Sequence, residues 1–174
     1  MSEAYNNFQV SIRDAEQMLA FFDQLNKENA SVNDPEVLKR GALIMTLTAW
    51  ETYVEDRVKE EVDCRLRALD GSQVANFVKG QLDQELKTFH NPNSRKTKKL
   101  FEDFVGKDVT EFWRWPGIDV EAARTKLNEW ISKRGDAVHR SITDKQGSHL
   151  VGRNDMEKCI KFFKQLVIAT DEAI

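Results

Sequence analysis

The feature of this sequence that most constrains its fold is a long helical pattern in the first half of the chain. Apolar side chains recur there every three or four positions, at Leu43, Leu47, Trp50, Val54, Val58, Val62 and Leu66. This spacing places them on one face of an α-helix. We predict one long helix with Asp34 as N-cap and Pro35 in its first position, running to about Leu69, ahead of Gly71.

Other segments show the same periodicity, and each predicts a helix with one inward face. The expected helices cover an N-terminal segment, residues 72–89, residues 95–105, a segment that Asp119 caps, and a final segment that opens at Asn154 or Asp155. The expected inward residues are, in chain order, Phe8, Ile12, Ala15, Leu19 and Phe22; Val74, Phe77 or Val78, Leu82 and Leu86; Leu100, Phe101 and Phe104; Ala123, Leu127, Trp130 and Ile131; and Met156, Ile160, Phe163 and Val167.

No alternating strand pattern of useful length interrupts these helices. With only 8 Gly and 3 Pro, the chain has little punctuation for many short strands. Residues 111–117 are expected to be an irregular aromatic segment, and residues 141–152 a loop. We find no linker or repeat, and predict an all-α fold with a single domain over residues 1–174, a bundle of about five to six helices.

Composition and charge narrow the function. The net charge of −3 argues against non-specific coating of nucleic acid but leaves room for a local basic cleft. Cys64 and Cys159 lie far apart and outside any Cys/His cluster, so we expect no metal and no cofactor. No apolar stretch approaches the length of a membrane span and no leader is recognisable, which predicts a cytoplasmic protein with no membrane partner.

The segment ISKRGDAVHR, residues 131–140, holds the best candidate for chemistry. Arg134 and His139 stand five residues apart, about 140° beyond a full turn and about 7.5 Å along an ideal helix. A guanidinium matches phosphate oxygens, and an imidazole exchanges protons near neutral pH. Together they suit metal-free attack by an RNA 2′-hydroxyl on its own phosphate. The residues alone also permit a plain alternative, in which both side chains cap carbonyls or are solvated.

Two segments together resemble a known family. LKRGALIMTLTAWETYVEDRVKEEV, residues 38–62, carries Trp50, Glu51 and Tyr53 on a long early helix, and ISKRGDAVHR carries Arg134 and His139 much later. In this order they resemble the HEPN superfamily, most closely the RiboL-PSP-HEPN type, with its Trp-Glu-x-Tyr-like segment and Arg-x4-6-His motif.

The resemblance implies a compact HEPN-like helical bundle and a symmetric homodimer in which two Arg-x4-6-His motifs line one composite site. It implies metal-independent endoribonuclease activity that leaves 2′,3′-cyclic phosphate and 5′-hydroxyl ends, in toxin–antitoxin or antiviral defence settings. Arg134 then handles the phosphate and His139 the protons. In the family the residue after the Arg is typically polar, whereas Gly135 stands here; Asp136, one step later, could supply the missing polar group and contact RNA. Some family members are inactive and only bind RNA or protein.

Further residues are candidates for the same site. Glu51 could orient Arg134 from a neighbouring helix, or be an ordinary boundary glutamate. Lys133 and Arg140 could bind adjacent phosphates, or simply be solvated near a helix end. Tyr53 could hydrogen-bond in the cleft, or pack.

Two other groups of side chains each allow two interpretations. The cations of RKTKK, residues 95–99, could contact an RNA backbone or carboxylates of a neighbouring helix. The aromatic residues Phe112, Trp113 and Trp115 could stack bases or close the core. His90 and His149 receive no role. The expected partners are an RNA substrate, a second copy of the chain and an antitoxin. The rival functions are a non-catalytic helical interaction module and a nucleotide-binding partner.

Overall fold

The structure is a computed structural model that describes residues 1–27, 36–143 and 151–174; the side chains of residue 36 and of residues 138–143 lie outside this description. Six α-helices make up most of these residues, and no strand occurs within them. The helices are α1 (Glu3–Lys27), α2 (Glu36–Leu66), α3 (Gln73–Lys87), α4 (Ser94–Val105), α5 (Val120–Thr143) and α6 (Arg153–Glu172). Two short 3-10 helices, Arg67–Leu69 and Val109–Phe112, lie between them.

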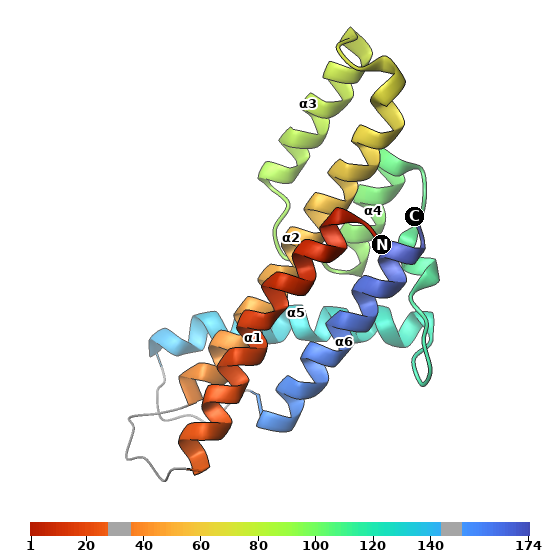
Figure 1. Cartoon of the computed structure of the whole chain (residues 1–174). Coiled ribbons are helices and arrows are strands. Elements are labelled where there is room, and N and C mark those ends of the chain that lie inside the picture. Colours follow the sequence, from red (N-terminus) through yellow and green to blue (C-terminus); the bar gives the residue numbers. More distant parts are fainter. Residues whose placement is uncertain (28–35, 144–150) are drawn as a thin grey trace.

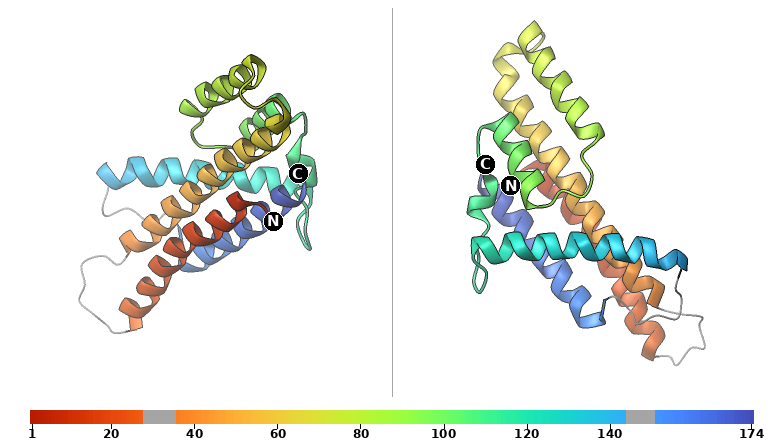
Figure 2. Two further views of the ribbon diagram at one scale, coloured as in Figure 1. Left: turned by 45° about the horizontal axis from the view of Figure 1, so that its top comes forward. Right: turned by 180° about the vertical axis from the view of Figure 1, so that it is seen from behind.

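The long helix α2 is the centre of the bundle, as its sequence pattern predicts. Helices α1 and α6 run alongside it, and α5 crosses this layer (Figures 1 and 2). Helices α2 and α3 form a hairpin whose tip projects beyond the other helices (Figure 1). The chain ends lie close together, where the Ser2 amide donates to an Asp171 carboxylate oxygen at 3.0 Å. The prediction of a single all-α bundle is therefore confirmed.

The core is aromatic at the middle of α2. Trp50 is fully buried, and its ring lies about 6 Å from those of Tyr53, Trp113 and Phe163. The indole Nε1 of Trp50 donates to the carbonyl of Pro92 at 3.0 Å. This bond ties the loop between α3 and α4 to the core.

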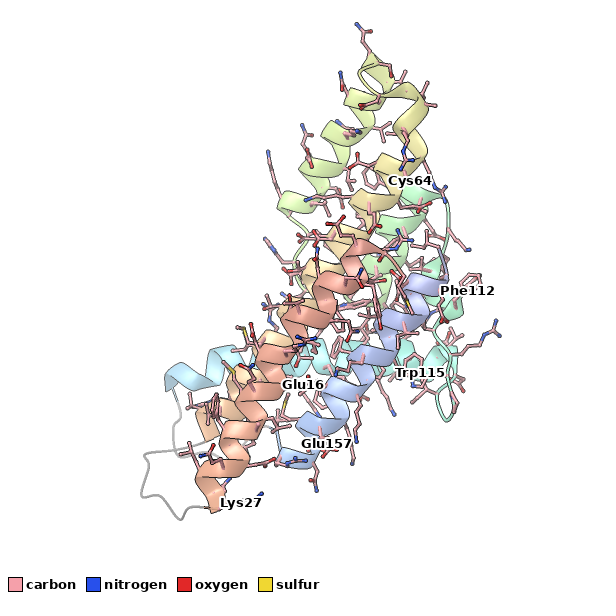
Figure 3. All side chains as sticks on the ribbon, in the orientation of Figure 1. Glu16, Lys27, Cys64, Phe112, Trp115 and Glu157 are labelled. Carbon is pink, nitrogen blue, oxygen red and sulfur yellow. The ribbon has the colours of Figure 1, made fainter. Side chains whose placement is uncertain are left out.

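The aromatic side chains that follow α4 close one side of the core, which is one of the two interpretations that the sequence allowed. Trp113 is fully buried, and its Nε1 donates to the Thr170 hydroxyl at 2.9 Å. Trp115 packs on Phe162 of α6 with ring centres 5.7 Å apart, whereas Phe112 is partly exposed (Figure 3). Burial of Trp113 within the core favours the closing role over base stacking.

Helix α3 corrects the sequence prediction. Val74, predicted to face inward, is 61% exposed. Of the alternatives Phe77 and Val78, Val78 packs against the core and Phe77 is 67% exposed, while Ala75, Leu82 and Leu86 are buried. The reason is that α3 packs mainly on α2, so only a narrow stripe of its surface is covered. An apolar residue beside that stripe stays in solvent, and the periodicity alone could not distinguish the two faces.

The boundaries of α5 and α2 differ from expectation in detail. Asp119 caps α5 as predicted, its carboxylate accepting from the Ala122 amide at 2.8 Å. The helix then continues through Gly135 to Thr143, into the segment predicted to be a loop. Helix α2 ends at Leu66 and a 3-10 turn completes the predicted length, while the start signal Asp34–Pro35 lies outside the described residues.

Across residues 1–27, 36–143 and 151–174, no helix combines the length and the apolar character needed to cross a membrane.

Candidate functional site

The side chain of Arg134 reaches from α5 to α2 and to the α3–α4 loop. Its Nη1 donates to Asn91 Oδ1 at 2.6 Å and to Glu51 Oε2 at 3.3 Å. The side chains of Arg134 and Glu51 are 21% and 18% exposed, so the pair lies at the edge of the core. Among described residues these are the hydrogen-bond partners of Arg134, and both involve Nη1, so no described residue accepts from Nη2 or Nε.

Glu51 connects three separate parts of the site. Its Oε2 accepts from Arg134 and also from the backbone amide of Asn91 at 3.0 Å. Its other oxygen, Oε1, lies 3.5 Å from Nδ1 of His90. The prediction that Glu51 orients Arg134 has this contact in its favour, because a partly buried carboxylate needs a partner and the guanidinium supplies one.

The α3–α4 loop is held in one shape by several bonds. Asn91 takes a left-handed backbone with φ of 53°, a conformation that Asn tolerates better than most residues. Asn93 caps α4 by accepting from the Lys96 amide at 2.9 Å, and Lys96 Nζ donates to the His90 carbonyl at 2.5 Å. The Ser94 amide donates to Asn128 of α5 at 3.0 Å. The loop therefore presents His90 and Asn91 at a fixed place beside Arg134.

His139 lies on the same helix as Arg134. Because α5 is continuous from Val120 to Thr143, the rotation and rise expected for an ideal helix apply between the two backbone positions. The side chains of His139 and Arg140 lie outside the described residues, so their roles stay predictions.

The remaining candidates fall in different surroundings. Lys133 is partly buried, with Nζ 4.5 Å above the centre of the Trp130 ring. Asp136 is exposed. Tyr53 is 1% exposed, and its hydroxyl lies 3.3 Å from the Val167 carbonyl and 3.4 Å from an Asp171 oxygen. The structure thus places Tyr53 in the interior, the packing alternative, and it does not join the group around Arg134.

Sequence reasoning missed two residues of this group, His90 and Asn91. The sequence signal was limited to HNPNS, a loop-forming composition that says nothing about which helix the loop contacts. The contact between Asn91 and Glu51 arises from tertiary packing, which the sequence pattern does not reveal.

The cations of RKTKK are mostly engaged with protein groups. Lys98 donates to Asp108 at 2.7 Å and lies 3.4 Å from Glu102. Lys99 pairs with Asp103 on the same helix. The carboxylate interpretation thus accounts for Lys98 and Lys99. Arg95 is exposed and has no partner among the residues described.

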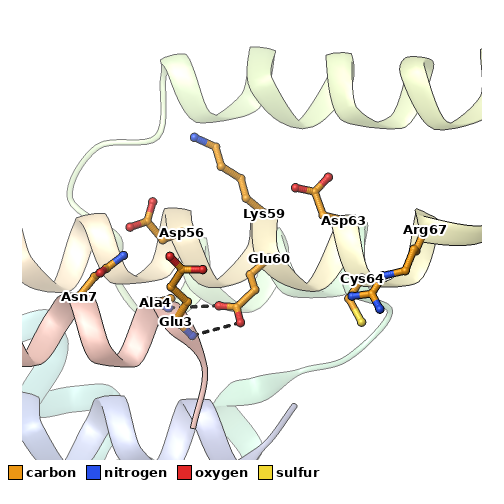
Figure 4. A pocket seen from close by; sticks show the side chains of 9 residues that line it. All are labelled: Glu3, Ala4, Asn7, Asp56, Lys59, Glu60, Asp63, Cys64 and Arg67. Carbon is orange, nitrogen blue, oxygen red and sulfur yellow. Dashed lines mark hydrogen bonds between the residues drawn. The ribbon is translucent and has the colours of Figure 1, made fainter. Parts of the chain in front are cut away.

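The pocket shown in Figure 4, of about 600 Å³, lies elsewhere, between α1 and the second half of α2. Glu60 within it accepts from the amides of Glu3 and Ala4 at 3.2 and 3.1 Å, capping α1. Its charged side chains are mainly acidic: Glu3, Asp56, Glu60 and Asp63 against Lys59 and Arg67. Such a surface repels phosphates, so the Arg134 group remains the better candidate for an RNA site.

Comparisons with known proteins bear on the same residues. Searches of curated proteins and of solved structures find no match. Among models of protein families, RiboL-PSP-HEPN matches residues 11–174, a range that holds Glu51, the α3–α4 loop and the Arg134–His139 segment. Because this match covers almost the whole chain, the protein belongs to the RiboL-PSP-HEPN family.

Proposed function

We propose that this protein is a metal-independent endoribonuclease. Arg134 binds the phosphate at the cleavage point, and His139 takes the proton of the adjacent 2′-hydroxyl. The oxygen then attacks phosphorus, and the products are a 2′,3′-cyclic phosphate and a 5′-hydroxyl. The RNase association of the family supports this proposal at the level of class.

The observation that carries the proposal is the anchoring of Arg134. One nitrogen of its guanidinium is bound to Glu51 and Asn91, while Nη2 and Nε have no acceptor among described residues. A guanidinium anchored through one nitrogen is pre-organised for the oxygens of a phosphate.

We also propose that the site is shared between two copies of the chain and that the activity serves as a toxin or an antiviral effector. In the dimer, two Arg134–His139 segments line one cleft that RNA enters. An antitoxin would block this cleft. Expression of wild-type protein then slows bacterial growth, and expression of His139→Ala does not.

The direct test is cleavage of a labelled RNA by purified protein in the presence of EDTA. We expect His139→Ala and Arg134→Ala to lower the cleavage rate by about 10²–10⁴-fold, the usual contribution of a group that transfers protons or holds developing charge. The exposed residue Lys126, on the same helix, offers the control variant Lys126→Ala. Equal cleavage by wild type and His139→Ala would remove the catalytic proposal.

The chemistry of the ends provides a second check. A 2′,3′-cyclic phosphate resists alkaline phosphatase until acid opens the ring, and a 5′-hydroxyl accepts phosphate from a polynucleotide kinase. Ends that carry a 5′-phosphate would indicate attack by water and contradict the 2′-hydroxyl mechanism.

A further inference from the structure

His90 lies on the same carboxylate as Arg134 but on its other oxygen. Its Nδ1 is 3.5 Å from Glu51 Oε1, while Arg134 Nη1 is 3.3 Å from Oε2. One carboxylate thus holds an imidazole and a guanidinium side by side. His90 comes from the α3–α4 loop and Arg134 from α5, so this juxtaposition exists only in the folded chain.

The imidazole is available to a ligand. The His90 side chain is 68% exposed, and Nε2 has no hydrogen-bond partner among described residues. Because the two nitrogens lie on opposite sides of the ring, Nε2 faces away from Glu51 when Nδ1 faces it. The backbone of the α3–α4 loop is held by two hydrogen bonds. Lys96 Nζ donates to the carbonyl of His90, and Trp50 Nε1 donates to the carbonyl of Pro92.

Cleavage by a 2′-hydroxyl needs two proton transfers. The attacking 2′-oxygen must lose a proton, and the departing 5′-oxygen must gain one, because an alkoxide is a poor leaving group. A single imidazole has to perform both in turn, whereas two imidazoles perform them at once. In the proposed dimer the second imidazole is either His139 of the partner copy or His90, and His90 already lies on the carboxylate that holds the phosphate-binding arginine.

Resting on the function proposed above, we propose that His90 is a second catalytic residue, the general acid that protonates the leaving 5′-oxygen. His139 accepts the 2′-hydroxyl proton while the O2′–P bond forms. The P–O5′ bond breaks, and its electron pair takes the proton from Nε2 of His90. His139 ends protonated and His90 neutral, and proton exchange with water restores both.

The charges around His90 fit this role. Glu51 provides a negative charge at Nδ1, which orients the ring and balances an imidazolium in the manner of a carboxylate–histidine dyad. Glu55, one turn further along α2, also interacts with His90; burial, and then the charge of Glu51, raise the pKa of the Glu55 carboxyl. Two cations lie near His90: Arg134 on α5 shares Glu51 with it, and Lys96 on α4 donates to its backbone carbonyl.

The test replaces the bridging 5′-oxygen of an RNA by sulfur. A thiolate leaves without protonation because its conjugate acid has a pKa of about 8.5. We expect His90→Ala to cleave normal RNA about 10²–10⁴-fold more slowly than wild type, yet to cleave the sulfur-bridged RNA at close to the wild-type rate. His139→Ala is expected to be slow on both substrates.

Thr88→Ala is the matched control, because Thr88 is exposed on the same loop and, among described residues, its hydroxyl donates to the Glu85 carbonyl alone. If His90→Ala is equally slow on both substrates, His90 is not the acid; if it is as fast as wild type on both, it has no catalytic task. Either result overturns this inference and leaves the proposed function standing. A wild-type protein that cleaves neither RNA overturns both.

Discussion

At the scale of the residue, Asn91 performs two tasks that a substitution can separate. Its backbone lies in the left-handed region, with φ of 53°, and its side chain accepts from Arg134 at 2.6 Å. Glycine adopts this backbone without cost, whereas an ordinary L-residue loses about 1–2 kcal/mol there. We expect Asn91→Ala to destabilise the protein by about this amount in urea unfolding, and Asn91→Gly much less.

Both variants remove the amide that holds Arg134, so both are expected to cleave RNA more slowly than wild type. The two variants thus separate the effect of the backbone conformation from that of the lost hydrogen bond. We expect them to differ in stability but to lose RNA cleavage to a similar extent. Full activity in Asn91→Gly would mean that Glu51 alone suffices to orient the guanidinium.

The residues of the site also show what a sequence can and cannot tell. Arg134 and His139 were recognisable because they share one helix, where spacing fixes their relation. Glu51 was proposed from the family resemblance, since nothing in its own helix distinguishes it from Glu55. His90 and Asn91 escaped notice because their contact with Glu51 depends on where a loop lies after tertiary packing, and no periodicity encodes that.

At the scale of the element, Asp108 ties α4, the following 3-10 helix and α5 together. It accepts from Lys98 at 2.7 Å and from the Thr110 amide and hydroxyl at 2.9 and 2.6 Å, and lies 3.6 Å from Arg124. Burial by itself raises the pKa of Asp108, but the hydrogen bonds from Lys98 and Thr110 outweigh it, so the pKa lies below its ordinary value.

A depressed pKa predicts a particular pH dependence. The ionised carboxylate stabilises the fold fully above the unfolded-state pKa of about 3.9, and this contribution is lost as the pH falls through the lower folded-state pKa. We expect Asp108→Asn to lower the free energy of unfolding by about 1–3 kcal/mol near pH 7, and by less near pH 3. Denaturant titrations at the two pH values measure the difference.

The control for Asp108 is Asp103→Asn. Asp103 pairs with Lys99 on the exposed face of α4, with side chains 48% and 65% exposed. Surface pairs of this kind contribute at most about 0.5–1 kcal/mol. If Asp108→Asn lowered the free energy of unfolding no more than Asp103→Asn does, the junction of α4, the 3-10 helix and α5 would not depend on the Asp108 carboxylate.

Helix α5 allows a second prediction at this scale. Gly135 lies within the helix, one residue after Arg134, and a Cβ added there meets nothing within 4 Å. Glycine within a helix costs about 1 kcal/mol relative to alanine. We expect Gly135→Ala to stabilise the protein by about that amount in thermal or urea unfolding.

Gly80 in α3 is the matched control, because it too is helical with nothing within 4 Å of an added Cβ. If Gly80→Ala stabilised the protein and Gly135→Ala did not, this part of α5 would not be helical in solution. The sequence predicted a loop over residues 141–152, although α5 continues to Thr143. Helix boundaries depend on neighbours as well as propensity, which is why the stripes were predicted better than the ends.

At the scale of the whole molecule, the protein separates its charges. The pocket between α1 and α2 is lined mainly by acidic side chains and the net charge is −3, whereas Arg95 and Lys96 lie in the first turn of α4, beside the α3–α4 loop, and Arg134 binds Asn91 of that loop. If RNA binding follows the local potential, the proposed function places the strand at the face around this loop. If two such faces meet in a dimer, the groups of two chains act on one phosphate.

That arrangement makes a prediction about mixtures of inactive variants. If the phosphate is held by Arg134 of one copy and the 2′-hydroxyl is deprotonated by His139 of the other, a dimer of Arg134→Ala with His139→Ala keeps one complete pair. Refolding the two inactive variants together is then expected to restore up to about a quarter of wild-type activity, since half of randomly paired dimers are mixed and one of their two pairs is intact.

A site built within a single chain gives a different result, because every chain in the mixture lacks one of the two groups and no activity returns. Mixing either variant with itself is the control, and sedimentation at the assay concentration establishes that dimers are present. Activity that returns in the mixture and falls on dilution below the dimer dissociation constant would tie catalysis to the pairing of chains. Dimers without recovery would assign Arg134 and His139 to the same copy, and would then require the reach of the arginine side chain to span their separation along α5.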